Sequence, residues 1–418
     1  MLSLILLRTP QMMKKWTAYL PTLGLLLVAF IVAWQLLKFR QNQKDKLHEG
    51  LSATLIKEQK IYRLSLEQRA LTALPSSLAQ QQKLRELYLA GNCLANLPPY
   101  IYDFRDLVHL DLEGRPYEIR KTACGNQIEQ LSEDLGQLAQ LRYLNLNHNA
   151  LQGLPQSMVQ LDQLQQLLLR NNRLKALPDS LFLCQNLQEV DLSRNRLPIF
   201  PQQLMKLPQL QRLNLAQNEF GELSPFWPSS LRQLNLMGNA IYIYPLFLPP
   251  NLEELDLSLC SLQTIADSLA LQPKLKQLNL AQNQLDQLPR HWSMPVLEKL
   301  YLAQNLLTDS ALGAQNWPQK LKVLDLQNNK LALSAGLVLG QELEVLRLGH
   351  NQIEQWRAKP GPKLLLLDLS NNQIDSFSVD HLAQYPKLRR LYLDGNPISG
   401  ECLDQLQKAR PQLFIRRE

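Results

Sequence analysis

The stretch LQEVDLSRN, residues 187–195, contains the pattern that decides the fold of this chain. Val190 and Leu192 are two positions apart, so they lie on the same side of an extended strand, and the residue between them points the other way. Asn195 follows where the chain must turn off the strand. Because its amide both donates and accepts, it can satisfy backbone groups that the turn would otherwise leave unpaired. The stretch therefore predicts a short strand, buried on one side and closed by a sharp turn.

The same pattern recurs fifteen times, in units that begin at residues 61, 84, 107, 141, 164, 187, 210, 231, 252, 275, 297, 321, 343, 364 and 388. The spacing is 21 to 24 residues with one exception of 34, and only Arg69 and Cys260 replace Asn at the turn. We predict a structural ladder formed by Asn92, Asn126, Asn149, Asn172, Asn195, Asn218, Asn239, Cys260, Asn283, Asn305, Asn329, Asn351, Asn372 and Asn396.

These units resemble leucine-rich repeats. Many add a Leu-Pro pair, as at Leu154-Pro155 and Leu177-Pro178, which is similar to the intracellular Ras-group and Scribble-like class and to bacterial repeats. The resemblance implies an α/β solenoid, a horseshoe of about 15 repeats with parallel strands on the concave face. The repeats would occupy residues 61–399. Because the ends of a solenoid expose core, we expect a capping helix over 47–60 and a C-terminal cap over 400–418.

Residues 16–37 contain no charged side chain over 22 residues, which predicts a transmembrane helix. A short basic tail (1–15) precedes it and a basic juxtamembrane linker (38–46) follows. An anchor is favoured, although a cleaved signal peptide stays open because Lys14 and Lys15 could form its charged region. Counting nearby Lys and Arg favours the cytoplasmic side for the repeats by a small margin.

Charge and cysteine usage exclude several classes of protein. Residues 1–60 carry nine Lys/Arg against three Asp/Glu, whereas the formal charge of the whole chain is +7, so the repeats are nearly neutral. A nucleic-acid-binding body is therefore not expected. The five cysteines are scattered and odd in number, which favours reduced thiols over a disulfide framework. The sequence contains no Asn-x-Ser/Thr sequon, which is typical of a bacterial or cytoplasm-facing protein.

No motif for catalysis, metal binding or a cofactor is present: there is no P-loop, no H-E-x-x-H, no G-x-S-x-G and no C-x-x-C. We therefore expect a binding protein without enzymatic activity or cofactor. Much of the concave face reads as a solvated ladder of Asp and Asn. The first strands depart from it with aromatic, apolar and Arg side chains typical of interface anchors. This predicted patch consists of Tyr88, His109, Asp111, Tyr143, Leu168 and Arg170. A second, weaker group is Tyr301, Arg347, Arg390 and Tyr392.

The third unit is interrupted between its strand and its turn. Its turn Asn falls at residue 126 and not at 115, so residues 115–125 are inserted, with Arg115, Tyr117, Arg120 and Lys121 among them. Insertions into repeats form loops, often on the binding face, although a neutral surface insertion costs little.

Together these features predict a membrane-anchored scaffold that binds a protein or peptide partner through its concave face. The alternative is an exported envelope or surface protein that recognises a ligand, glycan or host factor, with the repeats outside the cytoplasm.

Overall fold

The computed structural model describes residues 61–114, 124–224, 226–241, 248–265, 269–289, 292–312, 317–334, 336–359 and 361–417. The expected tail (1–15), membrane span (16–37), basic linker (38–46) and capping helix (47–60) lie outside these ranges. So do Arg115, Tyr117, Arg120 and Lys121 of the insertion. Within the described ranges, no helix is both long and apolar enough to span a bilayer.

The chain divides into two compact units. The smaller consists of Met1–Ile61 and Pro75–Gln81, and its described part contains the 3-10 helix η1 (Ser76–Gln80). The larger consists of Tyr62–Leu74 and Gln82–Glu418 and contains all the described strands.

The larger unit is built on one parallel sheet of 16 strands whose spatial order is their order in the sequence. The strands are β1 (Arg63–Ser65), β2 (Glu86–Tyr88), β3 (His109–Asp111), β4 (Tyr143–Asn145), β5 (Gln166–Leu168), β6 (Glu189–Asp191), β7 (Arg212–Asn214), β8 (Gln233–Asn235), β9 (Glu254–Asp256), β10 (Gln277–Asn279), β11 (Lys299–Tyr301), β12 (Val323–Asp325), β13 (Val345–Arg347), β14 (Leu366–Asp368), β15 (Arg390–Tyr392) and β16 (Phe414–Arg416). Each predicted unit contributes one strand, which confirms the parallel solenoid. The segment expected as a C-terminal cap adds the sixteenth strand, β16, after a helix.

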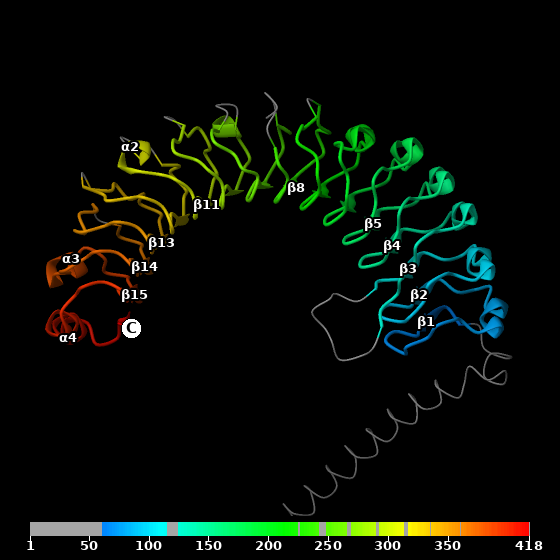
Figure 1. The fold of residues 1–418 in the computed structure, drawn as a ribbon, viewed down its shortest axis with the longest axis horizontal. Coiled ribbons are helices and arrows are strands. Elements are labelled where there is room, and N and C mark those ends of the chain that lie inside the picture. The colour runs from blue at the N-terminus through cyan, green and yellow to red at the C-terminus, as the bar shows by residue number, and fades with distance from the viewer. Residues whose placement is uncertain are drawn as a thin grey trace, which may run out of the picture. The chain divides into compact units, whose positions relative to one another are not determined.

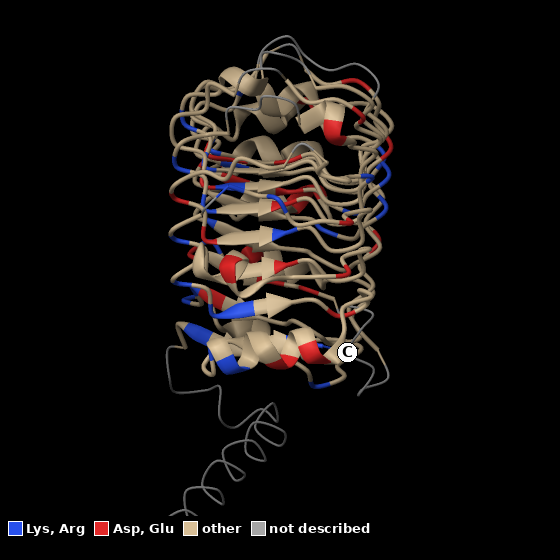
Figure 2. Cartoon of the chain, turned by 90° about the vertical axis from the view of Figure 1, so that its left-hand side faces the viewer, with Lys and Arg blue, Asp and Glu red and all other residues tan. Residues whose placement is uncertain are grey.

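In each three-residue strand the central residue faces the core. Leu87, Leu110, Leu144 and Leu167 have no exposed surface, whereas the residues on either side of each are more exposed or face the open side of the sheet. The strands line the inner, concave side of the curved ribbon, and helices lie on its outer side (Figure 1). In Figure 2 the strands that face the viewer lie parallel, one above another, with charges of both signs beside them.

The helices of the larger unit are mostly single 3-10 turns and not the α-helices that an α/β solenoid suggests. They are η2 (Pro99–Asp103), η3 (Glu133–Gln137), η4 (Gln156–Gln160), η5 (Asp179–Leu183), η6 (Gln202–Lys206), η7 (Leu269–Leu271), α2 (Asp309–Leu312), α3 (Val379–Ala383) and α4 (Gly400–Ala409). The proline of the Leu-Pro pair explains the start of several of them, since Pro155 and Pro178 occupy the N-cap positions of η4 and η5 with φ of −68° and −63°. A tight turn that buries one anchor, such as Met158 or Leu181, fits the few residues that each repeat leaves there.

The side chain of Asn195 links two adjacent coils. Its Oδ1 accepts from the backbone N–H of Leu174 at 3.0 Å, and its Nδ2 donates to the carbonyls of Leu169 and Leu192, each at 2.9 Å. Arg194, just before it, has a positive φ of 56°, which makes the turn sharp. The same arrangement recurs at Asn172, Asn218, Asn283, Asn305, Asn329, Asn351 and Asn372.

The other ladder positions contribute similar bonds. Nδ2 of Asn92, Asn126, Asn149, Asn239 and Asn396 donates to strand-end carbonyls. Cys260 replaces the amide with a thiol that donates to Leu236 O at 3.3 Å, and burial raises its pKa to about 11. That thiol is therefore protonated and unreactive at neutral pH.

The expectation of reduced thiols is wrong for two of the five cysteines. Cys93 and Cys124 form a disulfide, with their Cα atoms 5.3 Å apart. Cys93 follows the turn Asn of the second repeat. The insertion delays the turn of the third repeat, so Cys124 arrives beside it. The chain leaves the third strand at Gly114, where an added Cβ would overlap the carbonyl of His148. Cys184, Cys260 and Cys402 are free.

Candidate partner-binding surface

A row of stacked side chains crosses the first four strands on the concave side of the sheet. The guanidinium of Arg63 lies 4.8 Å from the ring centroid of Tyr88. The rings of Tyr88 and His109 are 4.6 Å apart, and those of His109 and Tyr143 are stacked at 4.1 Å with an interplanar angle of 5°. The parallel register sets up this contact, because it pairs His109 directly with Tyr143. We call Arg63, Tyr88, His109 and Tyr143 the aromatic row.

The structure thus brings together three residues of the predicted patch and adds Arg63. Asp111 is paired in register with both Tyr88 and Asn145, so it borders the row. The other two predicted residues lie further along the sheet. Leu168 is in register with Asn145. Arg170 follows β5, and its backbone N–H donates to Oδ1 of Asn147 at 2.7 Å.

The border of the aromatic row is electrostatically unusual. Burial raises the pKa of Asp111 to about 6, and the carboxylates of Glu113 and Glu67 add to this, although the backbone N–H of Glu113 donates to Asp111 at 3.0 Å. Burial and the same acidic surroundings raise the pKa of Tyr143 to about 12. Burial lowers the pKa of His109, so its imidazole is neutral at pH 7. The aromatic row therefore presents neutral rings beside the carboxylate of Asp111, whose nearest charged neighbours are other carboxylates.

We expect Asp111→Asn to stabilise the protein at pH 7.5, because the Asp111 carboxylate is ionised there although burial disfavours its charge. Solvent screens part of this cost, so the expected gain is about 1 kcal/mol. The folded-state pKa lies above that of the unfolded chain, so the folded state binds the proton more tightly, and stability falls as pH rises towards 6. The advantage of Asn should therefore shrink as the pH falls from 6 towards 4. Urea unfolding of both proteins across this range measures it. An advantage that is constant with pH would contradict the assignment.

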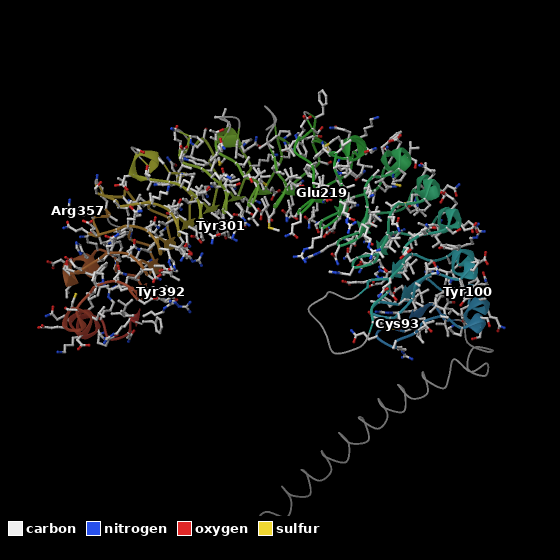
Figure 3. The ribbon with its side chains drawn as sticks, in the orientation of Figure 1. Cys93, Tyr100, Glu219, Tyr301, Arg357 and Tyr392 are labelled. Carbon is white, nitrogen blue, oxygen red and sulfur yellow. A yellow bond between two sulfur atoms is a disulfide. The ribbon has the colours of Figure 1, made fainter. Side chains whose placement is uncertain are left out.

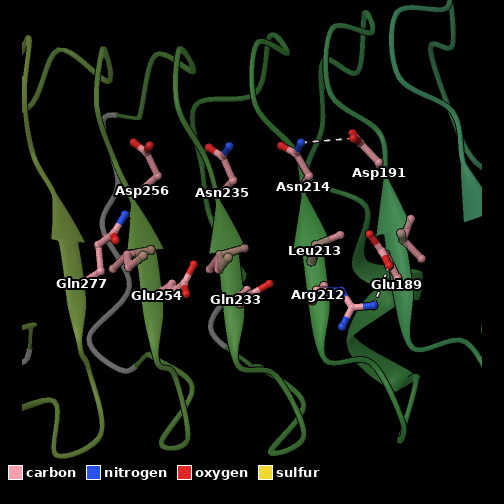
Figure 4. Close-up of a pocket in the computed structure, with 13 residues that line it drawn as sticks. Glu189, Asp191, Arg212, Leu213, Asn214, Gln233, Asn235, Glu254, Asp256 and Gln277 are labelled. Carbon is pink, nitrogen blue, oxygen red and sulfur yellow. Dashed lines mark hydrogen bonds and ion pairs between the residues drawn. The ribbon is translucent and has the colours of Figure 1, made fainter. Parts of the chain in front are cut away.

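A groove of about 290 Å³ lies further along the concave face, over β6 to β10 (Figure 4). Its charged lining residues are Glu189, Asp191, Arg212, Glu254 and Asp256, and its other polar lining is amide. Arg212 pairs with Glu189 at 2.6 Å, and Asn214 donates to Asp191 at 3.2 Å. The sequence pattern assigned Asp191 and Asp256 to a solvated ladder of Asp and Asn and gave no role to Glu189, Arg212 or Glu254. The available signal was the excess of carboxylates over cations on neighbouring strands.

In the second predicted group, Arg347 has a carboxylate partner on the neighbouring strand, and Arg390 begins β15 at an exposed position. Tyr301 and Tyr392 lie on the inner side of the ribbon (Figure 3). Arg347 pairs with Asp325 at 3.4 Å, and the face of Tyr392 is covered by the guanidinium of Arg416 at 5.4 Å. Within the described ranges, no group of three or more His, Cys, Asp or Glu side chains could hold a metal ion.

Comparisons with protein families give a consistent result. The model of a family described as "Leucine rich repeat" matches residues 124–174, 163–220, 250–307 and 341–398. Among curated proteins, mouse nephrocan is 32% identical over 168 residues, which cover 39% of this chain and 32% of nephrocan. Human oligodendrocyte-myelin glycoprotein is 28% identical over 182 residues, covering 42% of this chain and 40% of that protein. The matches therefore span less than half the length of these relatives.

Two solved structures resemble the chain over most of its length. The leucine-rich repeat protein LIC12759 of Leptospira interrogans has a TM-score of 0.71 and 27% identity, covering 87% of this chain and 98% of that one. The ectodomain of the plant receptor kinase GASSHO1/SCHENGEN3 from Arabidopsis thaliana, solved in complex with CASPARIAN STRIP INTEGRITY FACTOR 2, has a TM-score of 0.61 and 25% identity. It covers 85% of this chain and 44% of that one.

Proposed function

The chain belongs to the leucine-rich repeat family, whose model matches about half of its residues, and on that premise we propose that it is a membrane-anchored binding protein that holds a protein or peptide partner on its concave face. The anchor is residues 16–37, on the basis of their uncharged apolar sequence. The similar plant ectodomain, solved as a complex with its factor, supports a partner of this kind.

The aromatic row is the observation that favours the concave face. Its rings are held in place by stacking on one another and by a bond from the Tyr88 hydroxyl to Glu86 at 3.0 Å. Side chains that are already ordered lose little rotamer entropy when a partner binds. Tyrosine and arginine are also the residues that most often dominate the energy of protein interfaces.

We expect alanine at Tyr88, Tyr143 and Arg170 together to weaken binding of the partner about tenfold or more, because interface anchors lose energy of this order on truncation. Proximity labelling in cells would identify the partner, and its affinity for both purified proteins would then be measured. The matched control replaces Tyr301, Tyr392 and Arg347, which lie elsewhere on the same face, and should leave binding almost unchanged. Equal losses in the two variants, or none in the first, would remove the aromatic row from the proposal.

The Cys93–Cys124 disulfide favours the non-cytoplasmic side for the repeats, since disulfides persist in oxidising compartments and are rare in the cytosol. This supports the exported alternative against the small margin from the basic residues around the membrane span. We therefore propose an envelope or surface protein whose repeats face outward from the membrane.

A topology reporter tests this sidedness. We expect alkaline phosphatase fused after Glu418 to be active, because it folds only after export, and a cytoplasm-dependent fluorescent protein fused at the same place to stay dark. The opposite pair of results would place the repeats in the cytoplasm, and the concave-face binding proposal would stand without the exported location.

A further inference from the structure

Five basic side chains gather in repeats 5 and 6. They are Arg170, Arg173, Lys175, Arg194 and Arg196, which we call the basic flank. They lie on the loops that leave β5 and β6. No acidic residue occurs in residues 163–178 or in residues 192–218, which contain these loops.

Backbone hydrogen bonds place the basic residues of the two coils next to one another. The N–H of Arg196 donates to the carbonyl of Leu174, one residue after Arg173, at 2.9 Å. The N–H of Asn171, one residue after Arg170, donates to the carbonyl of Ser193, one residue before Arg194, at 2.8 Å. Coils stacked at the spacing of strands, about 4.8 Å, therefore set like charges side by side.

Elsewhere in the solenoid, neighbouring coils pair opposite charges. Glu253 forms ion pairs with both Arg232 and Lys276, each at 2.7 Å, and Lys363 forms an ion pair with Glu342 at 2.6 Å. Within the described ranges, none of the five side chains of the basic flank forms an ion pair with a carboxylate. Like charges held close together on neighbouring coils repel one another, so this cluster lowers stability unless an anion neutralises it.

Two further observations support an anionic ligand. Among the residues that the structure describes, none offers a hydrogen-bond partner to the buried Nε of Arg170. Burial lowers the pKa of His148 on the preceding coil. Glu113 opposes this shift, whereas the charges of Arg170 and Arg194 lower the pKa further, so both guanidinium groups act on the His148 ring. Four of the five side chains are arginines, whose planar guanidinium binds phosphate and sulfate through paired hydrogen bonds.

We propose that the basic flank binds a linear polysaccharide that bears phosphate or sulfate groups. A chain with anions at regular intervals matches cations that recur from one coil to the next. A protein partner is less suited, because large exposed apolar side chains in these two repeats are limited to Leu183 and Ile199, and protein interfaces need an apolar or aromatic core. Arg170 belongs both to the predicted patch and to the basic flank, so the test below substitutes Arg173 and Arg196, which lie outside that patch. Either proposal can therefore fail alone.

The test uses the full-length protein in detergent and four fluorescent polymers: dextran sulfate, phosphorylated dextran, neutral dextran and poly-L-glutamate. Wild type should bind the two anionic dextrans, with affinity that falls steeply as salt rises, and should not bind neutral dextran. The double variant Arg173→Gln/Arg196→Gln should bind them about tenfold more weakly, because it loses two charge-assisted forks. Binding to dextran sulfate alone or phosphorylated dextran alone would identify which anion is preferred.

The matched control is Lys387→Gln/Arg389→Gln, which removes the same net charge from exposed positions where repeat 14 meets repeat 15. It should change binding by less than about twofold, since these two side chains lie in other repeats, away from the basic flank. A loss of binding as large as that of Arg173→Gln/Arg196→Gln would mean that only the net charge of the protein matters, and it would overturn the proposal. Poly-L-glutamate binding as tightly as the anionic dextrans would also overturn it, in favour of an acidic peptide.

Folding is controlled separately. The melting temperature of Arg173→Gln/Arg196→Gln at low salt should equal or exceed that of wild type, because a repulsive pair has been removed. If that variant does not fold, Arg173→Lys/Arg196→Lys retains the charge but loses the guanidinium forks, and should weaken binding about threefold. Unchanged affinity in the lysine variant would then contradict the proposal.

Discussion

Asn195→Ala should lower the free energy of unfolding by roughly 3 kcal/mol, because it leaves several buried backbone groups without partners at once. Asn195 is buried, and its amide is bonded to backbone atoms of Leu169, Leu174 and Leu192. Leu174 lies on the preceding coil, so its N–H cannot reach another acceptor without separating the two coils. Urea unfolding measures the global loss. Amide exchange should locate the weakened protection in the fifth and sixth repeats, since each coil contacts only its neighbours.

The matched control is Asn186→Ala, at the end of the fifth repeat. Its amide also donates to a backbone carbonyl, that of Asp162 at 2.7 Å, but at an exposed position where water can replace the bond. We expect a loss of less than about 0.5 kcal/mol. Similar losses at Asn186 and Asn195 would mean that the buried ladder contributes no more to stability than an ordinary surface hydrogen bond.

Removing the Cys93–Cys124 disulfide by Cys93→Ser/Cys124→Ser should lower the free energy of unfolding by roughly 2–4 kcal/mol. The two cysteines are 31 residues apart, and a loop of this length greatly restricts the unfolded chain when it is closed. Thermal unfolding with and without reductant distinguishes the effect of losing the disulfide from the effect of the two serine side chains. Wild type should lose stability in dithiothreitol, and the double variant should not respond.

Cys402→Ser is the control for this experiment, because Cys402 is a free and partly exposed thiol. It should change stability by less than about 1 kcal/mol and should retain the response to reductant. A wild-type protein that is indifferent to reductant, purified from an oxidising compartment, would contradict the bond and remove its support for the exported location.

The repeat pattern predicted most of the fold because each unit specifies its own strand. The two-residue spacing of Val190 and Leu192 predicts which side of the strand is buried. The order of strands in the sheet follows because each coil stacks on the one before it. The sixteenth strand was missed because Phe414–Arg416 lacks the following turn Asn, and its pairing with β15 depends on a neighbour that the local pattern does not contain. The 3-10 turns were not predicted, because they depend on the few residues that each repeat leaves for its outer side.

The surface was less predictable, since it depends on which side chains meet across coils. Strand positions identified Tyr88, His109 and Tyr143, but Arg63 was overlooked because a single Arg on the first strand means little until its guanidinium is found over Tyr88. The disulfide required two distant cysteines to be brought together by the insertion, which no spacing rule reveals. The role of the predicted patch and of the insertion stays a prediction until binding is measured.

The disulfide also changes what proteolysis can do to the molecule. A cut anywhere between Gly114 and Cys124 opens the backbone, yet the pieces on either side stay joined through Cys93 and Cys124. A nicked chain would therefore migrate as one species on a non-reducing gel and separate into two fragments only after reduction. The insertion could be cleaved without releasing either part of the protein.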